Sequence, residues 1–159
     1  MSSLSSVSIA DLARKYEEAT NEFISVVESL APADLDKSDS EGWTPRQVVH
    51  HMADSESQSA ARLRRLLSEP VGTTIQGYDE NLWANNKTLG YADLPIDTAF
   101  AMFKASRALT LETIKRMTED QLQIAGVHTE SGPYTVAKWF ESYSKHPVDH
   151  ANQIRGCLN

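Results

Sequence analysis

Two histidines near the C-terminal end of the chain, His146 and His150, have the residue type and spacing that could bind a metal ion. Side chains four positions apart on an α-helix are neighbours, with Cβ atoms about 5–6 Å apart, so two imidazoles can converge on one ion. Imidazole ligands suit zinc, nickel, iron or copper, whereas magnesium and calcium prefer oxygen. The pair therefore indicates a transition-metal site, although a single His-x3-His spacing is a weak signal.

A third ligand must come from elsewhere in the chain, because a catalytic metal site typically takes three protein ligands and leaves one position open. His51 is the best-placed candidate, at the boundary of the apolar face of a predicted helix. His128, in a predicted loop, is a second candidate that could turn towards the ion. A competing ligand set is the pair His50 and Asp54, one turn apart on the exposed face of the same helix.

Other catalytic motifs are missing from the sequence. The chain has no Glu-x-x-His motif of the di-iron bundles, no His-Glu-x-x-His helix, no glycine-rich phosphate loop and no Gly-x-Ser-x-Gly elbow. No general base can be assigned from the sequence. The four candidates are close to the histidines only in sequence, and they are Asp54, Glu56, Asp79 and Glu80.

Four long amphipathic segments must position these side chains, and each shows apolar residues at helical spacing. The predicted helices span residues 9–30, 44–68, 97–117 and 135–157. Ser8 can cap the first, and Thr44 can cap the second with Pro45 at its first helical position. No clear strand alternation is present. The sequence therefore predicts an all-α fold, with one four-helix-bundle domain over residues 1–159.

The last predicted helix carries both histidines on its buried face, because its apolar stripe continues through them to Ile154. Pro147 lies between the two histidines and removes the hydrogen bond to the carbonyl of Tyr143, at a cost of about 3 kcal/mol in a straight helix. We favour a kink over a break at this proline, since the apolar stripe resumes at Ile154.

Two long connectors, residues 69–95 and 118–134, separate the last three helices. Long connectors in a small domain are usually functional, disordered or partly helical. Tyr78 and Trp83 in the first connector argue against disorder, since exposed aromatic rings are unfavourable in water.

Composition excludes several classes of function. The chain has 159 residues, 40% of them hydrophobic, and a formal charge of −7, which disfavours binding to nucleic acid or to anionic membranes. No apolar run has the roughly 20 residues of a membrane span, and residues 1–8 do not have the pattern of a signal peptide. A single cysteine, Cys157, suits a reducing compartment. We expect a cytoplasmic protein. The arginines at positions 62, 64 and 65 are interpreted as complements of a helix dipole.

Three stretches together resemble the DinB/YfiT-like superfamily: WTPRQVVHHMADS from Trp43 to Ser55, Tyr78-Asp79-Glu80-x-x-Trp83-Ala84, and His146-x3-His150-x2-Gln153-Ile154. The chain is most similar to the YfiT-like metal-dependent hydrolases, which are related to thiol S-transferases that use bacillithiol or mycothiol. The resemblance implies an up-down-down-up four-helix bundle, usually a homodimer, with a divalent metal on His51, His146 and His150. It also implies that the segment from Tyr78 to Trp83 lines the mouth of the site.

The expected function is that of an enzyme that uses zinc, nickel or iron to activate water or a low-molecular-weight thiol towards a small-molecule substrate. Glu56 and the residues at 147–149 depart from the pattern of the related sequences, which have histidines there. The alternative is a non-enzymatic bundle, acting in a stress response or binding a small molecule, in which the metal site is vestigial or structural. Such a bundle would have a filled core around the histidines.

Overall fold

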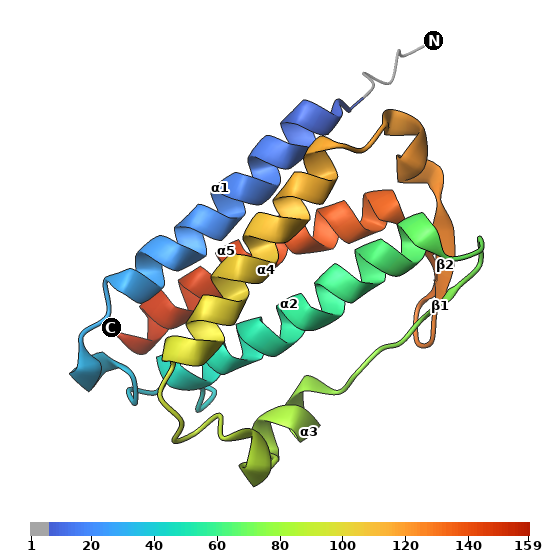
Figure 1. The fold of residues 1–159 in the computed structure, drawn as a ribbon. Helices are drawn as coiled ribbons and strands as arrows, with labels where there is room; N and C mark the ends of the chain where they lie inside the picture. Colours follow the sequence, from blue (N-terminus) through green and yellow to red (C-terminus); the bar gives the residue numbers. More distant parts are fainter. Residues whose placement is uncertain (1–6) are drawn as a thin grey trace.

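Four long helices run side by side in the computed structural model, which describes residues 7–159 (Figure 1). They are α1 (Ile9–Glu28), α2 (Pro45–Ser68), α4 (Asp97–Lys115) and α5 (Val136–Cys157). Helix α1 packs against α4 and α5, and α2 packs against the same two helices from the other side. In Figure 1, α1 and α5 run in one direction and α2 and α4 run in the opposite one. The predicted up-down-down-up four-helix bundle is confirmed.

The helix ends follow from local capping. The Ser8 hydroxyl accepts a hydrogen bond from the backbone of Asp11, and Thr44 accepts one from the backbone of Gln47. Pro45 takes the first position of α2, where its missing N–H leaves no bond unmade. The sequence placed the ends of α1 and α4 two residues too late, because apolar residues continue past the last helical turn.

The core consists of two apolar clusters separated by a layer of polar side chains. One cluster includes Tyr16, Trp139 and Phe140, and the other includes Phe23 and Phe103. On α1, α2 and α4, the polar layer lies between the residues that belong to the two clusters. Its buried polar and charged members are Thr20, Ser55, Glu56, Ser59, Arg107 and Thr110. Hydrogen bonds from the Arg107 guanidinium to Thr20 and Glu56 join α4 to α1 and α2 at this layer, and they offset part of the cost of burying its polar groups.

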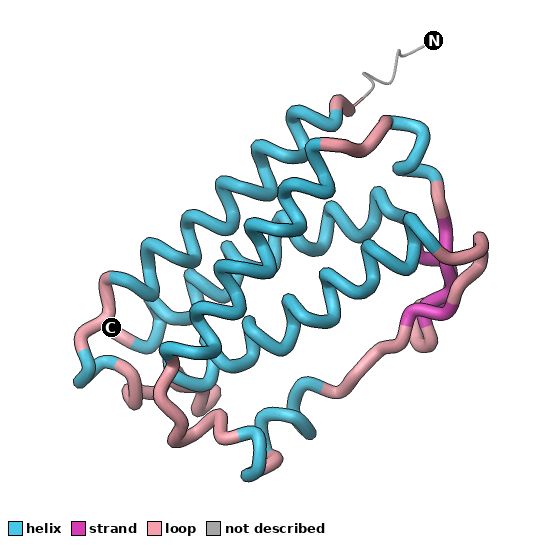
Figure 2. Tube along the Cα trace, in the orientation of Figure 1, coloured by secondary structure: helices cyan, strands magenta, loops and turns pink. Residues whose placement is uncertain are grey.

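A small sheet closes one end of the bundle, where the sequence predicted no strands (Figure 2). Strand β2 (Ala125–His128) pairs in parallel with β1 (Thr74–Ile75) and antiparallel with β3 (Gly132–Thr135), in the order β1-β2-β3. The strands have two to four residues, which is too short for an alternating pattern to be recognised. The sheet ties the two long connectors together.

The remaining elements are short helices in the connectors. They are α3 (Glu80–Asn85) and the 3₁₀ turns Pro32–Asp34, Lys87–Leu89 and Glu119–Gln123. The first connector is therefore partly helical, and the rings of Tyr78 and Trp83 pack with centroids 4.6 Å apart. Within residues 7–159, none of the helices has the length and apolar character needed to span a bilayer. The prediction about a signal peptide rests mainly on residues 1–6, which lie outside the described part of the chain.

Candidate metal centre

Three histidines from two helices converge inside the bundle. His51 extends from α2, and His146 and His150 extend from α5. One ring nitrogen of each lies within 4.8 Å of the ligand nitrogens of the other two. The centroids of the His146 and His150 rings are 4.4 Å apart, and that of His51 lies 4.7 Å from that of His150. The three residues chosen from helical spacing and from the family resemblance are the ones that the fold brings together.

The hydrogen bonds around His150 direct one ring nitrogen towards this convergence point. Its Nδ1 lies 2.7 Å from the Oε1 of Gln153, and because an amide oxygen only accepts, Nδ1 carries the proton. The Nε2 of His150 therefore has a free lone pair, and it faces the Nε2 of His146 at 3.0 Å. Two nitrogens at this distance need either a proton or a cation between them.

His51 is the clearest unsatisfied group in this region. Its side chain is 2% exposed, and neither ring nitrogen has a hydrogen-bond partner among the described residues. A buried polar atom without a partner costs about 1–3 kcal/mol. A metal ion bound at one of these nitrogens would remove that cost, so the donor set fits a bound cation.

Burial keeps the three imidazoles neutral. Burial, with a smaller contribution from the nearby His150, lowers the pKa of His51 to about 3. The pKa of His146 is also well below its ordinary value because of burial and its histidine neighbours, and burial lowers that of His150. Metals bind the neutral form of histidine, so the three side chains are in their ligand form at physiological pH.

Among the four carboxylates considered as general bases, only Glu80 lies at this site. It is the first residue of α3, and its Oε2 lies 3.5 Å from the Nε2 of His51. Asp79 caps α3, Asp54 accepts a hydrogen bond from a tyrosine, and Glu56 forms a buried ion pair with an arginine of α4. Only the tertiary structure distinguishes among them.

The other two histidines lie outside the cluster. His50 is buried rather than exposed, and its Nε2 pairs with the carbonyl oxygen of Leu94, so the competing ligand set with Asp54 is wrong. His128 ends strand β2 instead of lying in a loop. Its Nδ1 accepts hydrogen bonds from the backbone N–H groups of Glu130 and Ser131, and its ring lines a cavity next to the cluster.

Helix α5 continues through Pro147, so a break at this residue is excluded. His146 and His150 therefore remain one helical turn apart on the same element. The carbonyl of Tyr143, which cannot bond to the nitrogen of Pro147, accepts a hydrogen bond from the side chain of Arg107 instead. This bond from α4 compensates for the one that the proline removes.

Two cavities meet at the histidines, and both are lined by His51 and Glu80. The first, of about 410 Å³, is enclosed by α2, α5, the connector after β1 and the β2–β3 hairpin. The second, of about 360 Å³, extends past His150 towards Trp43. The first cavity is also lined by Tyr78, as expected of this segment. The three histidines are thus reachable from two sides.

The sequence interpretation of Arg62 as a complement of a helix dipole missed its place beside the histidines. Arg62 is partly buried and lines the first cavity, where it donates hydrogen bonds to the hydroxyl of Tyr143 at 3.0 Å and to the carbonyl of Gln76 at 2.9 Å. The dipole interpretation overlooks this role. The sequence feature that could have indicated this role is the position of Arg62 on the same helical stripe as His51, three turns further along α2.

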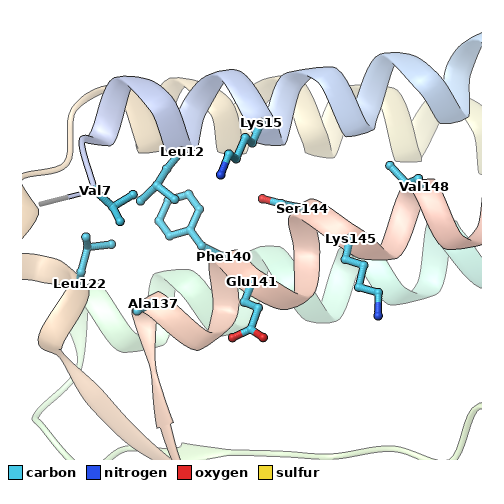
Figure 3. Close-up of a pocket in the computed structure, with 10 residues that line it drawn as sticks. All are labelled: Val7, Leu12, Lys15, Leu122, Ala137, Phe140, Glu141, Ser144, Lys145 and Val148. Carbon is cyan, nitrogen blue, oxygen red and sulfur yellow. The ribbon is translucent and has the colours of Figure 1, made fainter. Parts of the chain in front are cut away.

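A larger and mostly apolar pocket, of about 630 Å³, lies between α1 and α5 (Figure 3). Its lining includes Leu12 of α1 and two residues of α5, Phe140 and Val148, which occupy a different face of α5 from the metal-ligand candidates. None of the three clustered histidines lines it. The chemistry that the sequence predicts therefore belongs to the two cavities beside His51 rather than to this pocket.

A four-helix bundle with three histidines converging in its interior is the class of protein that the fold and the site define. The sequence model of the DinB superfamily matches residues 15–154, so the chain belongs to that superfamily. A protein of Oceanobacillus iheyensis named "putative metal-dependent hydrolase" is 30% identical over 147 residues, covering 92% of this chain and 83% of that protein. A Bacillus cereus protein of the same name is 29% identical over 150 residues, covering 92% and 84%.

Two solved structures share the fold. YfiT from Bacillus subtilis, described as "a probable metal-dependent hydrolase with an unusual four-helix bundle topology", superposes with a TM-score of 0.84 at 24% identity, over 99% of this chain and 89% of YfiT. A protein from Streptococcus pneumoniae superposes with a TM-score of 0.66 at 15% identity, over 94% of this chain and 89% of that one. At these identities, the similarity establishes the fold alone.

Proposed function

We propose that this chain is a metal-dependent enzyme, a hydrolase or a thiol S-transferase, in which His51, His146 and His150 hold one divalent transition-metal ion. The observation that carries the proposal is the 3.0 Å approach of the His146 and His150 Nε2 atoms, with the Nδ1 of His150 already bonded to Gln153. The buried, unpartnered nitrogens of His51 beside this pair support it. The nitrogen donor set favours zinc, nickel or iron.

When bound, such an ion would lower the pKa of water or of a low-molecular-weight thiol at its open position and so supply a nucleophile near neutral pH. The chain's own residues have two tasks. Gln153 orients the ring of His150 through Nδ1, as is usual for the partners of metal-ligating histidines. Glu80, which lies at the junction of the two cavities, accepts the proton that the nucleophile loses.

Two further observations support an enzyme over a non-enzymatic bundle. The related proteins of Oceanobacillus iheyensis and Bacillus cereus carry names that describe metal-dependent hydrolysis. The core around the histidines is not filled, because cavities of about 410 and 360 Å³ adjoin His51. Their volumes lie at the lower end of the range for small-molecule sites, which is about 300–1,000 Å³.

Elemental analysis of the purified, untagged protein tests this proposal. The parent should contain about one zinc, nickel or iron ion per chain, and the His146→Ala variant should contain little. His50→Ala is the matched control, because His50 is adjacent to His51 on α2 but bonds to Leu94 instead. Metal-free parent protein that takes up none on titration would refute the proposal, as would full metal content in His146→Ala.

The homodimer implied by the resemblance is a separate proposal. Light scattering on the eluate of a size-exclusion column tests it directly, since a dimer has twice the mass of the 17.6 kDa chain. A monomeric mass across a range of concentrations would contradict it without affecting the metal site, because all three proposed ligands come from one chain.

A further inference from the structure

The first cavity contains a cationic side chain whose hydrogen-bond partners are all neutral. Arg62 donates to the hydroxyl of Tyr143 and to the carbonyl of Gln76, and its Nε is buried with no acceptor among the described residues. By contrast, Arg107 and Arg46 each form an ion pair with a carboxylate at hydrogen-bond distance. Arg62 retains donor capacity on the wall of a cavity that a ligand can enter.

Two tyrosine hydroxyls beside Arg62 can add to this donor capacity. The hydroxyl of Tyr143 accepts from Arg62, which leaves its own proton free to be donated. The hydroxyl of Tyr134 is buried and has no partner among the described residues. A tyrosine hydroxyl is protonated at neutral pH, so both hydroxyls can act as donors. Three donor groups without sufficient acceptors therefore face the same cavity.

The two cavities beside the histidines differ in charge. Four carboxylates and neither lysine nor arginine line the second cavity, and these are Asp39, Glu41, Glu80 and Asp149. The first cavity shares Glu80 and has Glu130 at its exposed rim, but it also contains Arg62 and Lys138. An anion would be repelled from the second cavity and would find its cationic partners only in the first.

The donors around Arg62 are close to the histidine cluster. Tyr143, which is bonded to Arg62, has its ring centroid 6.1 Å from that of His146, nearly perpendicular to it. A small molecule that bonds to Arg62 therefore extends past Tyr143 towards His146 and His51, which line the same cavity. The cavity volume of about 410 Å³ limits such a ligand to a small organic molecule.

We propose that the first cavity binds the carboxylate group of a small organic substrate, with Arg62 as its cationic partner and Tyr134 and Tyr143 as hydroxyl donors. The planar guanidinium matches the planar carboxylate better than a lysine would, and the tyrosine rings suit an apolar or aromatic body on the ligand. The reactive end of the substrate faces His51 and His146. Only this orientation of the substrate's reactive end rests on the proposed metal-dependent function.

Titration calorimetry with benzoate tests the carboxylate site in two proteins, the metal-loaded parent and the metal-free His146→Ala variant. In the variant, benzoate cannot bind to a metal ion. Benzoate should bind to both. Adding Arg62→Gln to the metal-free variant should weaken binding on the order of 10- to 100-fold, the equivalent of a charge-assisted hydrogen bond. Tyr134→Phe removes one hydroxyl without touching the guanidinium and should weaken binding several-fold, on the order of fivefold.

Arg65→Gln is the matched control for charge, because Arg65 is on the same helix but pairs with Glu69 outside the cavity. It should leave benzoate affinity unchanged. Inorganic phosphate should bind more weakly than benzoate, and equal or stronger binding would overturn the assignment to a carboxylate. Benzoate binding that needs the metal, or that survives both Arg62→Gln and Tyr134→Phe, would overturn the site. Benzoate binding in a parent that takes up no metal would support the carboxylate site while refuting the proposed enzyme.

Discussion

The side chain of Arg107 donates a 3.0 Å hydrogen bond to the carbonyl oxygen of Tyr143, the carbonyl that Pro147 leaves without its helical partner. The same guanidinium bonds to Glu56 on α2, and to the Tyr16 carbonyl and Thr20 hydroxyl on α1. One side chain of α4 thus joins all four long helices. It does so at the turn of α5 that precedes His146, so the geometry of the histidine pair depends on it.

Replacing Arg107 by methionine should destabilise the protein strongly. The change leaves the Glu56 carboxylate buried without its partner and the Tyr143 carbonyl without a donor, and loss of one partner of a buried ion pair costs about 3–5 kcal/mol. Urea unfolding measures the loss. Arg116→Met, an exposed change just after α4, should have little effect. A double variant that also carries Glu56→Leu should recover part of the loss, and no recovery would contradict this interpretation.

Gln153 should determine how tightly the histidines bind metal. Gln153→Leu removes the acceptor that fixes the Nδ1 proton of His150, and loss of such a partner typically lowers metal affinity about 10- to 100-fold. A competition titration with a chromogenic chelator measures this. Asn152→Leu, at the exposed neighbouring position, is the control. Equal affinity in Gln153→Leu and the parent would show that the orientation of His150 does not depend on this bond.

Glu80→Gln should separate metal binding from catalysis. The variant should keep the parent's metal content, because the three histidines are unchanged, but it should lose the group that accepts the proton. Hydrolysis of p-nitrophenyl acetate, used as a generic probe, should slow by roughly 10²-fold or more. Glu141→Gln, an exposed carboxylate beside the apolar pocket of Figure 3, should retain the parental rate. An unchanged rate in Glu80→Gln would remove Glu80 from the mechanism.

The metal-free protein should lose stability as the pH falls below about 6.5. Burial lowers the pKa of His51, His146 and His150 in the folded state, whereas in the unfolded chain they titrate near 6.5. Between the folded and unfolded pKa values the unfolded chain binds more protons, so stability is full above 6.5 and declines as the pH falls. The slope should be roughly 1 kcal/mol per pH unit for each histidine that stays neutral.

Urea unfolding of chelator-treated protein between pH 7.5 and 4.5 measures that decline. In His51→Gln one of the three neutral histidines is gone, so its stability should change less steeply with pH than that of the parent. Stability that is independent of pH over this range would show that the histidines are not buried as the structure places them.

Local patterns in the sequence determined the helices and the candidate ligands. Thr44 and Pro45 located the start of α2 because capping depends only on neighbouring residues. The spacing of His146 and His150 placed them on one helical face for the same reason. The position of His51 at the boundary of an apolar helical face made it the best-placed third ligand, and the family resemblance agreed with that choice and supplied the up-down-down-up topology. These features depend on residues close together in the sequence or on motifs that cover most of the chain.

Only the tertiary structure decided which groups meet in space. Hydrogen bonds between segments far apart in sequence excluded His50 and brought Arg107 to the carbonyl beside Pro147. The 3.5 Å approach of Glu80 to His51 selected Glu80 from the four candidate carboxylates. The small sheet could not be foreseen, since strands of two to four residues form because their partners are present rather than from their own pattern. The same holds for Arg62, which becomes a cavity residue only once β1, the β2–β3 hairpin and α5 surround it.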